Sequence, residues 1–257
     1  MRGMTGEAAP LELRDVTSGY GDVPVIRRAS MTFRERLITT IVGSNGAGKS
    51  TAIKVAAGLL RAWQGSVLVR GTDITREPAD RRVYRGIGYV PQGRIVVPEM
   101  TVRDNLLIGA HILGNDRRAI EAAMERVLQL FPALKSRMKQ HADTMSGGEQ
   151  QMLAIGRALM TSPKVIMLDE PSMGLSPKFV EIVFERLLAL RDEGMTVVMV
   201  EQKASHALGI SDRGYVMHLG QVAYQGEARE LLGNEDVKRL FLGEIPESMQ
   251  ALSFDDA

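Results

Sequence analysis

The stretch GSNGAGKST, at residues 43–51, constrains the fold more than any other part of this chain. An apolar run of strand length, LITTIV at 37–42, precedes it, and a helical pattern, STAIKVAAGLL, follows. The stretch matches G-x-x-x-x-G-K-[ST] in full and in the strand–loop–helix context that the pattern requires. Its glycines Gly43, Gly46 and Gly48 let the backbone curl so that successive N–H groups point inward at an anion. The sequence therefore predicts an α/β core with a phosphate-binding P-loop.

The polar residues of this loop predict an ATP and Mg²⁺ site. Lys49 is expected to reach the β- and γ-phosphates, as a catalytic residue, and the Ser50 hydroxyl to coordinate Mg²⁺. The alternative is a glycine-rich turn that merely carries a lysine and a serine, and the flanking strand and helix argue against it. The predicted nucleotide-binding residues of the loop are Gly43, Ser44, Asn45, Gly46, Ala47, Gly48, Lys49, Ser50 and Thr51.

Hydrophobic periodicity predicts how the rest of the chain is organised. Continuous apolar runs with helical patterns between several of them are typical of parallel strands buried on both faces. LELRDVTSGY and VIRRASMTF alternate more like antiparallel strands, and only helical patterns lie between Thr101 and Thr161. We expect a P-loop NTPase core with an N-terminal antiparallel β-subdomain and an inserted helical subdomain at about 93–161. The predicted domain is 11–242, with tails at 1–10 and 243–257, and the apolar runs are 37–42, 66–70, 87–90, 165–168, 196–200 and 215–219.

Composition excludes several classes of protein. Lys and Arg number 32 against 31 Asp and Glu, a net charge of +1 that gives no electrostatic footprint for nucleic acid. The absence of cysteine excludes disulfides, thiolate catalysis and Cys-based metal sites. The first ten residues lack the apolar segment of a secretory signal, and no apolar run approaches the ~20 residues of a membrane-spanning helix.

A second chemical signal is VIMLDEP, in which Asp169 and Glu170 follow a buried strand. This is where a doubly wound sheet places its ligand-binding crevice. Asp169 fits the Walker-B role of holding Mg²⁺, and Glu170 could orient and deprotonate an attacking water. Alone, Asp-Glu-Pro would more simply end a strand and start a turn. Beside a P-loop, the pair predicts a hydrolytic site.

A third signal, MSGGEQQMLAIGRALM at 145–160, begins with a capping-type Ser146 and bare glycine backbone at a helix start, which is another anion-binding arrangement. Taken alone it would be a plain capped helix. Its place, about twenty residues before VIMLDEP, resembles the signature motif of ABC ATPases, which usually reads LSGGQ. Here Met145 and Glu149 depart from that wording. The resemblance implies that Ser146, Gly147 and Gly148 bind the nucleotide held by a partner subunit.

The resemblance extends over nearly the whole chain. Tyr20 in TSGYG is similar to the A-loop aromatic that stacks on adenine, although it could instead be a cross-strand aromatic. Gln92 in YVPQGR is similar to the Q-loop glutamine, which senses Mg²⁺ and links the site to the helical insertion, although it could be a surface amide. YVPQGRIVVPEMTVRDNL, EPSMGLSP, VEQ and VKRLFLG resemble the ATP-binding subunits of branched-chain amino acid importers.

That resemblance implies a peripheral protein on the cytoplasmic face of a bacterial inner membrane. It implies a second ATPase subunit, in a homo- or heterodimer, two membrane permeases and, indirectly, a substrate-binding protein. Close relatives handle urea or short amides, so related small amides are also expected substrates. The alternative is a soluble ABC ATPase acting on a ribosome or nucleic acid, which would be expected to be more basic or to carry two cassettes.

Two residues depart from the superfamily pattern. Ser176 stands where the D-loop commonly has aspartate, so contacts that use that carboxylate are not carried over. TVVMVEQ ends with Gln202 where most ABC ATPases have a histidine that contacts the γ-phosphate. We expect Gln202 to donate an N–H to that phosphate without titrating, as a catalytic residue, unless the strand merely ends in solvent there. His206, about one helical turn on, is expected to face solvent or core.

Overall fold

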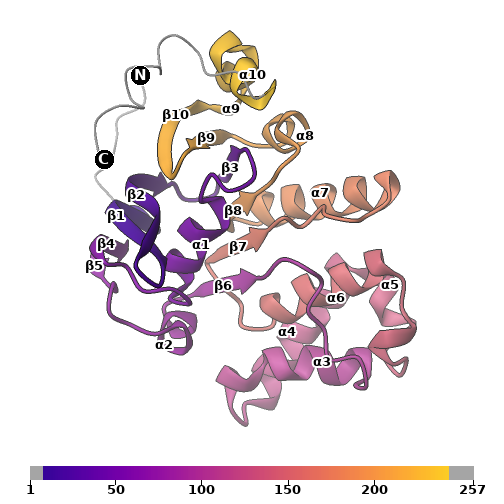
Figure 1. Cartoon of the computed structure of the whole chain (residues 1–257). Helices are drawn as coiled ribbons and strands as arrows, with labels where there is room; N and C mark the ends of the chain where they lie inside the picture. Colours follow the sequence, from indigo (N-terminus) through magenta and orange to yellow (C-terminus); the bar gives the residue numbers. More distant parts are fainter. Residues whose placement is uncertain (1–7, 243–257) are drawn as a thin grey trace.

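The computed structural model describes residues 8–242, so most of the two predicted tails lies outside the described residues. A six-stranded sheet forms the centre of the protein (Figure 1). Five neighbouring strands are parallel, and the edge strand β10 is antiparallel to β9. In spatial order the strands are β10 (Gln221–Glu227), β9 (Arg213–His218), β3 (Ile38–Gly43), β8 (Thr196–Val200), β7 (Val165–Asp169) and β6 (Ile87–Val90).

A smaller antiparallel sheet lies against this core and confirms the predicted N-terminal β-subdomain. Its order is β2 (Val23–Phe33), β1 (Leu11–Tyr20), β4 (Gln64–Val69) and β5 (Thr72–Asp73). The expectation that run 66–70 belongs to the parallel sheet was wrong, because β4 pairs antiparallel with β1. Three consecutive residues of β4, Val67 to Val69, are buried. Successive side chains of a strand point to opposite faces of its sheet, so β4 is buried on both faces although it is antiparallel to its neighbour. A continuous apolar run therefore does not distinguish a parallel strand from an antiparallel one.

Helices connect the parallel strands as the sequence predicted. Helix α1 (Lys49–Ala57) follows β3, α7 (Pro177–Asp192) joins β7 to β8, and α8 (Ala204–Gly209) joins β8 to β9. The chain ends its described part with α9 (Ala228–Gly233) and α10 (Glu235–Leu242). No helix among the described residues is long and apolar enough to cross a membrane.

The C-terminus of α1 is closed by a buried arginine from α2 (Ala79–Tyr84). Arg82 is only 2% exposed and donates four hydrogen bonds to backbone carbonyls. Two of the acceptors, Val55 and Ala56, belong to the last turn of α1, where carbonyls lack helical partners and a cation is favoured by the helix dipole. Arg82 therefore joins the end of the P-loop helix to the loop around Thr75 and Glu77.

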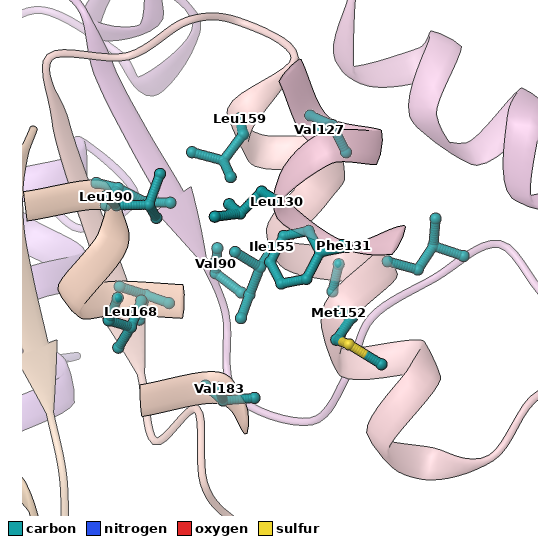
Figure 2. Packing of buried hydrophobic residues seen from close by; sticks show 14 of the residues in the cluster. Val90, Val127, Leu130, Phe131, Met152, Ile155, Leu159, Leu168, Val183 and Leu190 are labelled. Carbon is teal, nitrogen blue, oxygen red and sulfur yellow. The ribbon is translucent and has the colours of Figure 1, made fainter. Parts of the chain in front are cut away.

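The helices between β6 and β7 form the predicted helical insertion: α3 (Val102–Gly109), the 3₁₀ helix η1 (His111–Leu113), α4 (Arg117–Leu130), α5 (Pro132–Lys135), the 3₁₀ helix η2 (Ala142–Thr144) and α6 (Gly147–Leu159). Figure 2 shows how α6 joins this insertion to the sheet: Met152, Ile155 and Leu159 lie in the same apolar cluster as Val90 and Leu168 of β6 and β7. The cluster fixes where α6 begins relative to the ends of the strands. The domain boundaries 11–242, with the insertion at about 93–161, remain our proposed division of the chain.

Candidate functional site

The P-loop curls because its glycines adopt backbone that other residues avoid. Gly48 has φ +94, and a Cβ there would lie 2.6 Å from the Ile26 side chain. A Cβ on Gly43 would overlap the carbonyl oxygen of Met217 on the neighbouring strand β9. Strands β2 and β9 thus press on the loop, and only glycine at both positions lets it pass between them.

Lys49 is held inside the loop that it serves. Its side chain is 5% exposed, and Nζ donates to the carbonyl oxygens of Gly43 at 2.9 Å and Ser44 at 3.0 Å. Burial lowers the pKa of Lys49, and the charges of Glu170 and Asp169 oppose that shift. A lysine already oriented by two carbonyls can exchange them for phosphate oxygens with little loss of side-chain freedom.

The structure brings together Ser50 and Asp169, the two residues predicted to hold Mg²⁺, and that role stays a prediction. Ser50 Oγ donates to Asp169 Oδ1 at 2.7 Å, and Asp169 is 1% exposed at the end of β7. A hydroxyl and a carboxylate are oxygen ligands of the kind that Mg²⁺ prefers, usually completed by water and substrate phosphates. Among residues 8–242 no three His, Cys, Asp or Glu side chains gather as a metal cluster.

Glu170 follows directly and has an unusual backbone. Its φ is +49, a region uncommon for residues other than glycine, and its N–H donates to Val200 O at 2.9 Å. Strained backbone of this kind clusters at functional sites. The side chain is not free, because Gln92 Nε2 donates to Glu170 Oε2 at 3.1 Å and also contacts Met173 Sδ. The structure brings Gln92 to the predicted general base; its role as a metal ligand stays a prediction.

Ser146 caps α6 as expected. Its hydroxyl accepts a hydrogen bond from the N–H of Glu149, whose carboxylate accepts one from the N–H of Ser146, forming a capping box. The first two helical residues lie against other side chains: a Cβ on Gly147 would meet the end of the flexible Arg94 side chain, which would have to move, and one on Gly148 would overlap the ring of Phe179. The amides at this helix start lie on the helical insertion. Their role in nucleotide binding stays a prediction.

Tyr20 and Gln202 are exposed, as residues that meet a ligand can be. Tyr20 is 52% exposed at the end of β1 and pairs with Val23, two residues before the strand segment that packs on Gly48. This places the end of β1 close in sequence register to the part of β2 that packs on the P-loop, while stacking of Tyr20 on adenine remains a prediction. Gln202 is exposed two residues beyond Val200, whose partner on β7 is Asp169. His206 is exposed on α8.

One residue that sequence reasoning missed is Glu201, which is only 2% exposed. It accepts hydrogen bonds from the N–H of Ser172 at 2.8 Å and from its hydroxyl at 2.9 Å, and burial raises its pKa. Glu201 therefore holds the turn that follows Glu170. The two polar residues that end TVVMVEQ therefore differ in their surroundings. Glu201 is a buried carboxylate that supports this turn, and Gln202 is an exposed amide. Glu201 could have been found from the sequence if β7 and β8 had been recognised as parallel neighbours, because the residues that follow two such strands lie close together.

Two further contacts were missed because they join distant segments. Tyr89 OH donates to Asp169 Oδ2 at 3.3 Å, and burial together with the Asp169 charge raises the pKa of Tyr89. Arg94 Nη2 donates to Gly174 O at 3.1 Å, while its guanidinium lies against Gly147. Arg94 thus bridges the start of α6 and the turn after β7. Neither residue belongs to a motif that names these roles.

Comparison with known proteins agrees with this geometry. The ABC transporter family model matches residues 26–173. BraG of Pseudomonas aeruginosa, a high-affinity branched-chain amino acid transport ATP-binding protein, is 41% identical over 233 residues, covering 91% of this chain and 99% of BraG. LivF of Archaeoglobus fulgidus, a probable branched-chain amino acid transport ATP-binding protein, is 41% identical over 229 residues, covering 89% and 96%.

Solved structures agree as well. The ADP conformation of an ATP-binding cassette of an ABC transporter superimposes with a TM-score of 0.83 at 30% identity, covering 93% of this chain and 100% of that one. A nucleotide-free cassette from an ABC transporter gives 0.80 at 28% identity. These matches confirm the fold class and the family resemblance. The chain belongs to the ABC transporter family and is one of its ATP-binding cassettes, an ATPase.

Proposed function

We propose that this protein is the ATP-hydrolysing subunit of an ABC importer for branched-chain amino acids or related small amides. The observation that carries the proposal is the convergence of Lys49, Ser50, Asp169 and Glu170 at one edge of the sheet. The names of BraG and LivF support the substrate class. Those names describe transport proteins and so do not favour a soluble ATPase acting on a ribosome or nucleic acid.

The chain's own residues divide the work of hydrolysis. Loop amides and Lys49 bind and neutralise the phosphates. Ser50 and Asp169 would hold Mg²⁺, which would supply further positive charge to stabilise the phosphates. Glu170 accepts the proton of the attacking water. Gln92 holds Glu170 Oε2 in this structure, which leaves Oε1 for the water. The helical insertion, which continues from Gln92, is therefore placed to influence how the base meets the water.

The proposed assembly is a dimer on the cytoplasmic face of a membrane, with this chain peripheral to its permeases. The start of α6, with Ser146, Gly147 and Gly148, completes the nucleotide site of the second ATPase subunit. A groove of about 260 Å³ between α2 and β6 on one side and α3 and α6 on the other is the proposed permease contact. Its exposed apolar rim includes Leu59 and Ile108, and Pro91 in its wall is next to Gln92. A substrate-binding protein would act on the permeases.

Separating binding from turnover tests the ATPase mechanism. Lys49→Ala should weaken ATP binding because it removes a charge-assisted phosphate contact. Glu170→Gln should retain ATP binding and lose steady-state hydrolysis by about 10²-fold or more, the typical contribution of a general base. Glu181→Gln, on the exposed surface of α7, is the matched control and should hydrolyse ATP normally. Near-normal hydrolysis by Glu170→Gln would reject Glu170 as the base.

Mixing two inactive chains tests the shared site. Lys49→Ala and Ser146→Arg chains each lack one half of the site, but a mixed dimer still contains one intact composite site. ATPase activity should therefore reappear when the two variants are mixed. If this chain pairs with a different ATPase subunit, the two substitutions are placed in that heterodimer, one in each subunit. Normal hydrolysis by the Ser146→Arg protein alone would show that the site is not shared. Loss of leucine uptake by membrane vesicles carrying the Glu170→Gln complex would connect the site to transport.

A further inference from the structure

Both oxygens of the Asp169 carboxylate have a hydroxyl donor, and only one of the two donors, Ser50, was assigned a role from the sequence. Ser50 of the P-loop donates to Oδ1 at 2.7 Å. Tyr89 of β6 donates to Oδ2 at 3.3 Å. The two hydroxyls approach from different elements, α1 and β6, so the carboxylate is held from two sides.

The strand register explains why Tyr89 reaches this position. Strands β6 and β7 are parallel neighbours, with Tyr89 paired to Met167, two residues before Asp169. The tyrosine side chain is long enough to extend toward the carboxyl end of β7, and its ring packs against the cluster that includes Ile53 and Met167. The ring also forms part of the wall of the groove proposed as the permease contact. Packing against this cluster therefore holds the Tyr89 ring in place, and the position of the ring determines where the hydroxyl lies.

An aspartate carboxylate would otherwise turn easily. The χ2 torsion of aspartate has a broad energy minimum, so a single donor on Oδ1 leaves the plane of the carboxylate poorly defined. A second donor on Oδ2 defines it. Partners of this kind orient metal ligands, and their loss typically weakens metal affinity about 10- to 100-fold.

We propose that Tyr89 is a positioning residue whose hydroxyl orients the Asp169 carboxylate for the magnesium ion of the nucleotide. This inference rests on the proposed function of the site, and it gives a role to a residue that was assigned none from the sequence. At 3.3 Å the bond is long, so the expected loss lies at the low end, about tenfold.

Tyr89→Phe tests this because it removes only the hydroxyl and retains the ring. In the Glu170→Gln background, where ATP should be bound without turnover, calorimetry gives the ATP dissociation constant with excess Mg²⁺ and with EDTA. The ratio of the two constants measures what the metal adds to binding. We expect Tyr89→Phe to reduce that ratio about tenfold and to leave the constant in EDTA unchanged. Tyr84→Phe, at an exposed tyrosine of α2, is the matched control and should change neither value.

The possible outcomes separate the proposals. An unchanged ratio in Tyr89→Phe overturns the positioning role. An equal loss of affinity with Mg²⁺ and with EDTA also overturns it, because the hydroxyl would then support the site as a whole and not the metal. If the Glu170→Gln parent gains no affinity from Mg²⁺, the proposed metal site itself fails, and the inference with it.

Discussion

Replacing Arg82 with methionine should destabilise the protein through the end of the P-loop helix. Methionine retains much of the apolar stem of the side chain and removes the guanidinium, which donates to four carbonyls at 2.8–3.0 Å. Val55 O keeps a second donor, Gly58 N, at 3.1 Å. The carbonyls of Ala56, Thr75 and Glu77 lose the guanidinium, and no second donor within the described residues takes its place.

The magnitude follows from those carbonyls. A hydrogen bond to a charged group contributes about 1.5–3 kcal/mol, and a buried acceptor left without a donor costs about 1–3 kcal/mol. Burial lowers the pKa of Arg82, so the native guanidinium is itself desolvated, and removing it recovers part of the loss. We expect a net loss of about 3–5 kcal/mol, which at this chain length lowers the melting temperature by roughly 6–20 °C.

Thermal unfolding of the nucleotide-free protein, followed by circular dichroism, measures the effect. Arg81→Met is the matched control, because Arg81 is the exposed neighbour on the same helix, and it should stay within about 0.5 kcal/mol of the parent. Arg82→Lys keeps a charge but cannot reach all four carbonyls, so it should fall between the two. Equal melting temperatures for Arg82→Met and Arg81→Met would refute the reasoning, since the carbonyls would then be satisfied without the arginine.

Three further predictions concern the site. Burial raises the pKa of Glu201, so the stability it contributes is present at low pH and is lost as pH rises through the folded-state pKa. In urea titrations Glu201→Gln should therefore gain free energy of unfolding over the parent as pH rises above the ordinary range of a glutamate, and a constant difference would contradict this. Gly148→Ala should impair ATPase activity and melt at lower temperature, because its Cβ would overlap the Phe179 ring, while Phe179→Ala in the same chain should restore part of the stability. Gln202→Ala should reduce turnover by the complete complex more than ATP affinity, and the parent should show no histidine-like step near pH ~6.5 from this position; unchanged turnover would make Gln202 only the end of a strand.

Local motifs made much of the site predictable from sequence. The glycines of GSNGAGKST determine the backbone conformation of the P-loop. Asp169 and Glu170 were predictable because they follow a strand, and Ser146 because it precedes a helix. The residues that support them could not be predicted in this way. Tyr89 meets Asp169, Glu201 meets Ser172 and Arg82 meets α1 through contacts that depend on strand register and helix placement, which short patterns do not contain. The misplaced run 66–70 has the same cause, because a short apolar strand does not encode the direction of its partner.

The hydrogen bond between Gln92 and Glu170 bears on how much ATP the transporter hydrolyses when it carries no substrate. In this arrangement Gln92 occupies one of the two carboxylate oxygens of the proposed general base, so an attacking water has only Oε1 fully available. Gln92 lies in the segment that leads into the helical insertion, the part of the chain that a permease is proposed to touch, so a shift of that segment would change the contact. On the proposed mechanism, the basal hydrolysis rate of an idle transporter would then report how often Gln92 leaves Glu170.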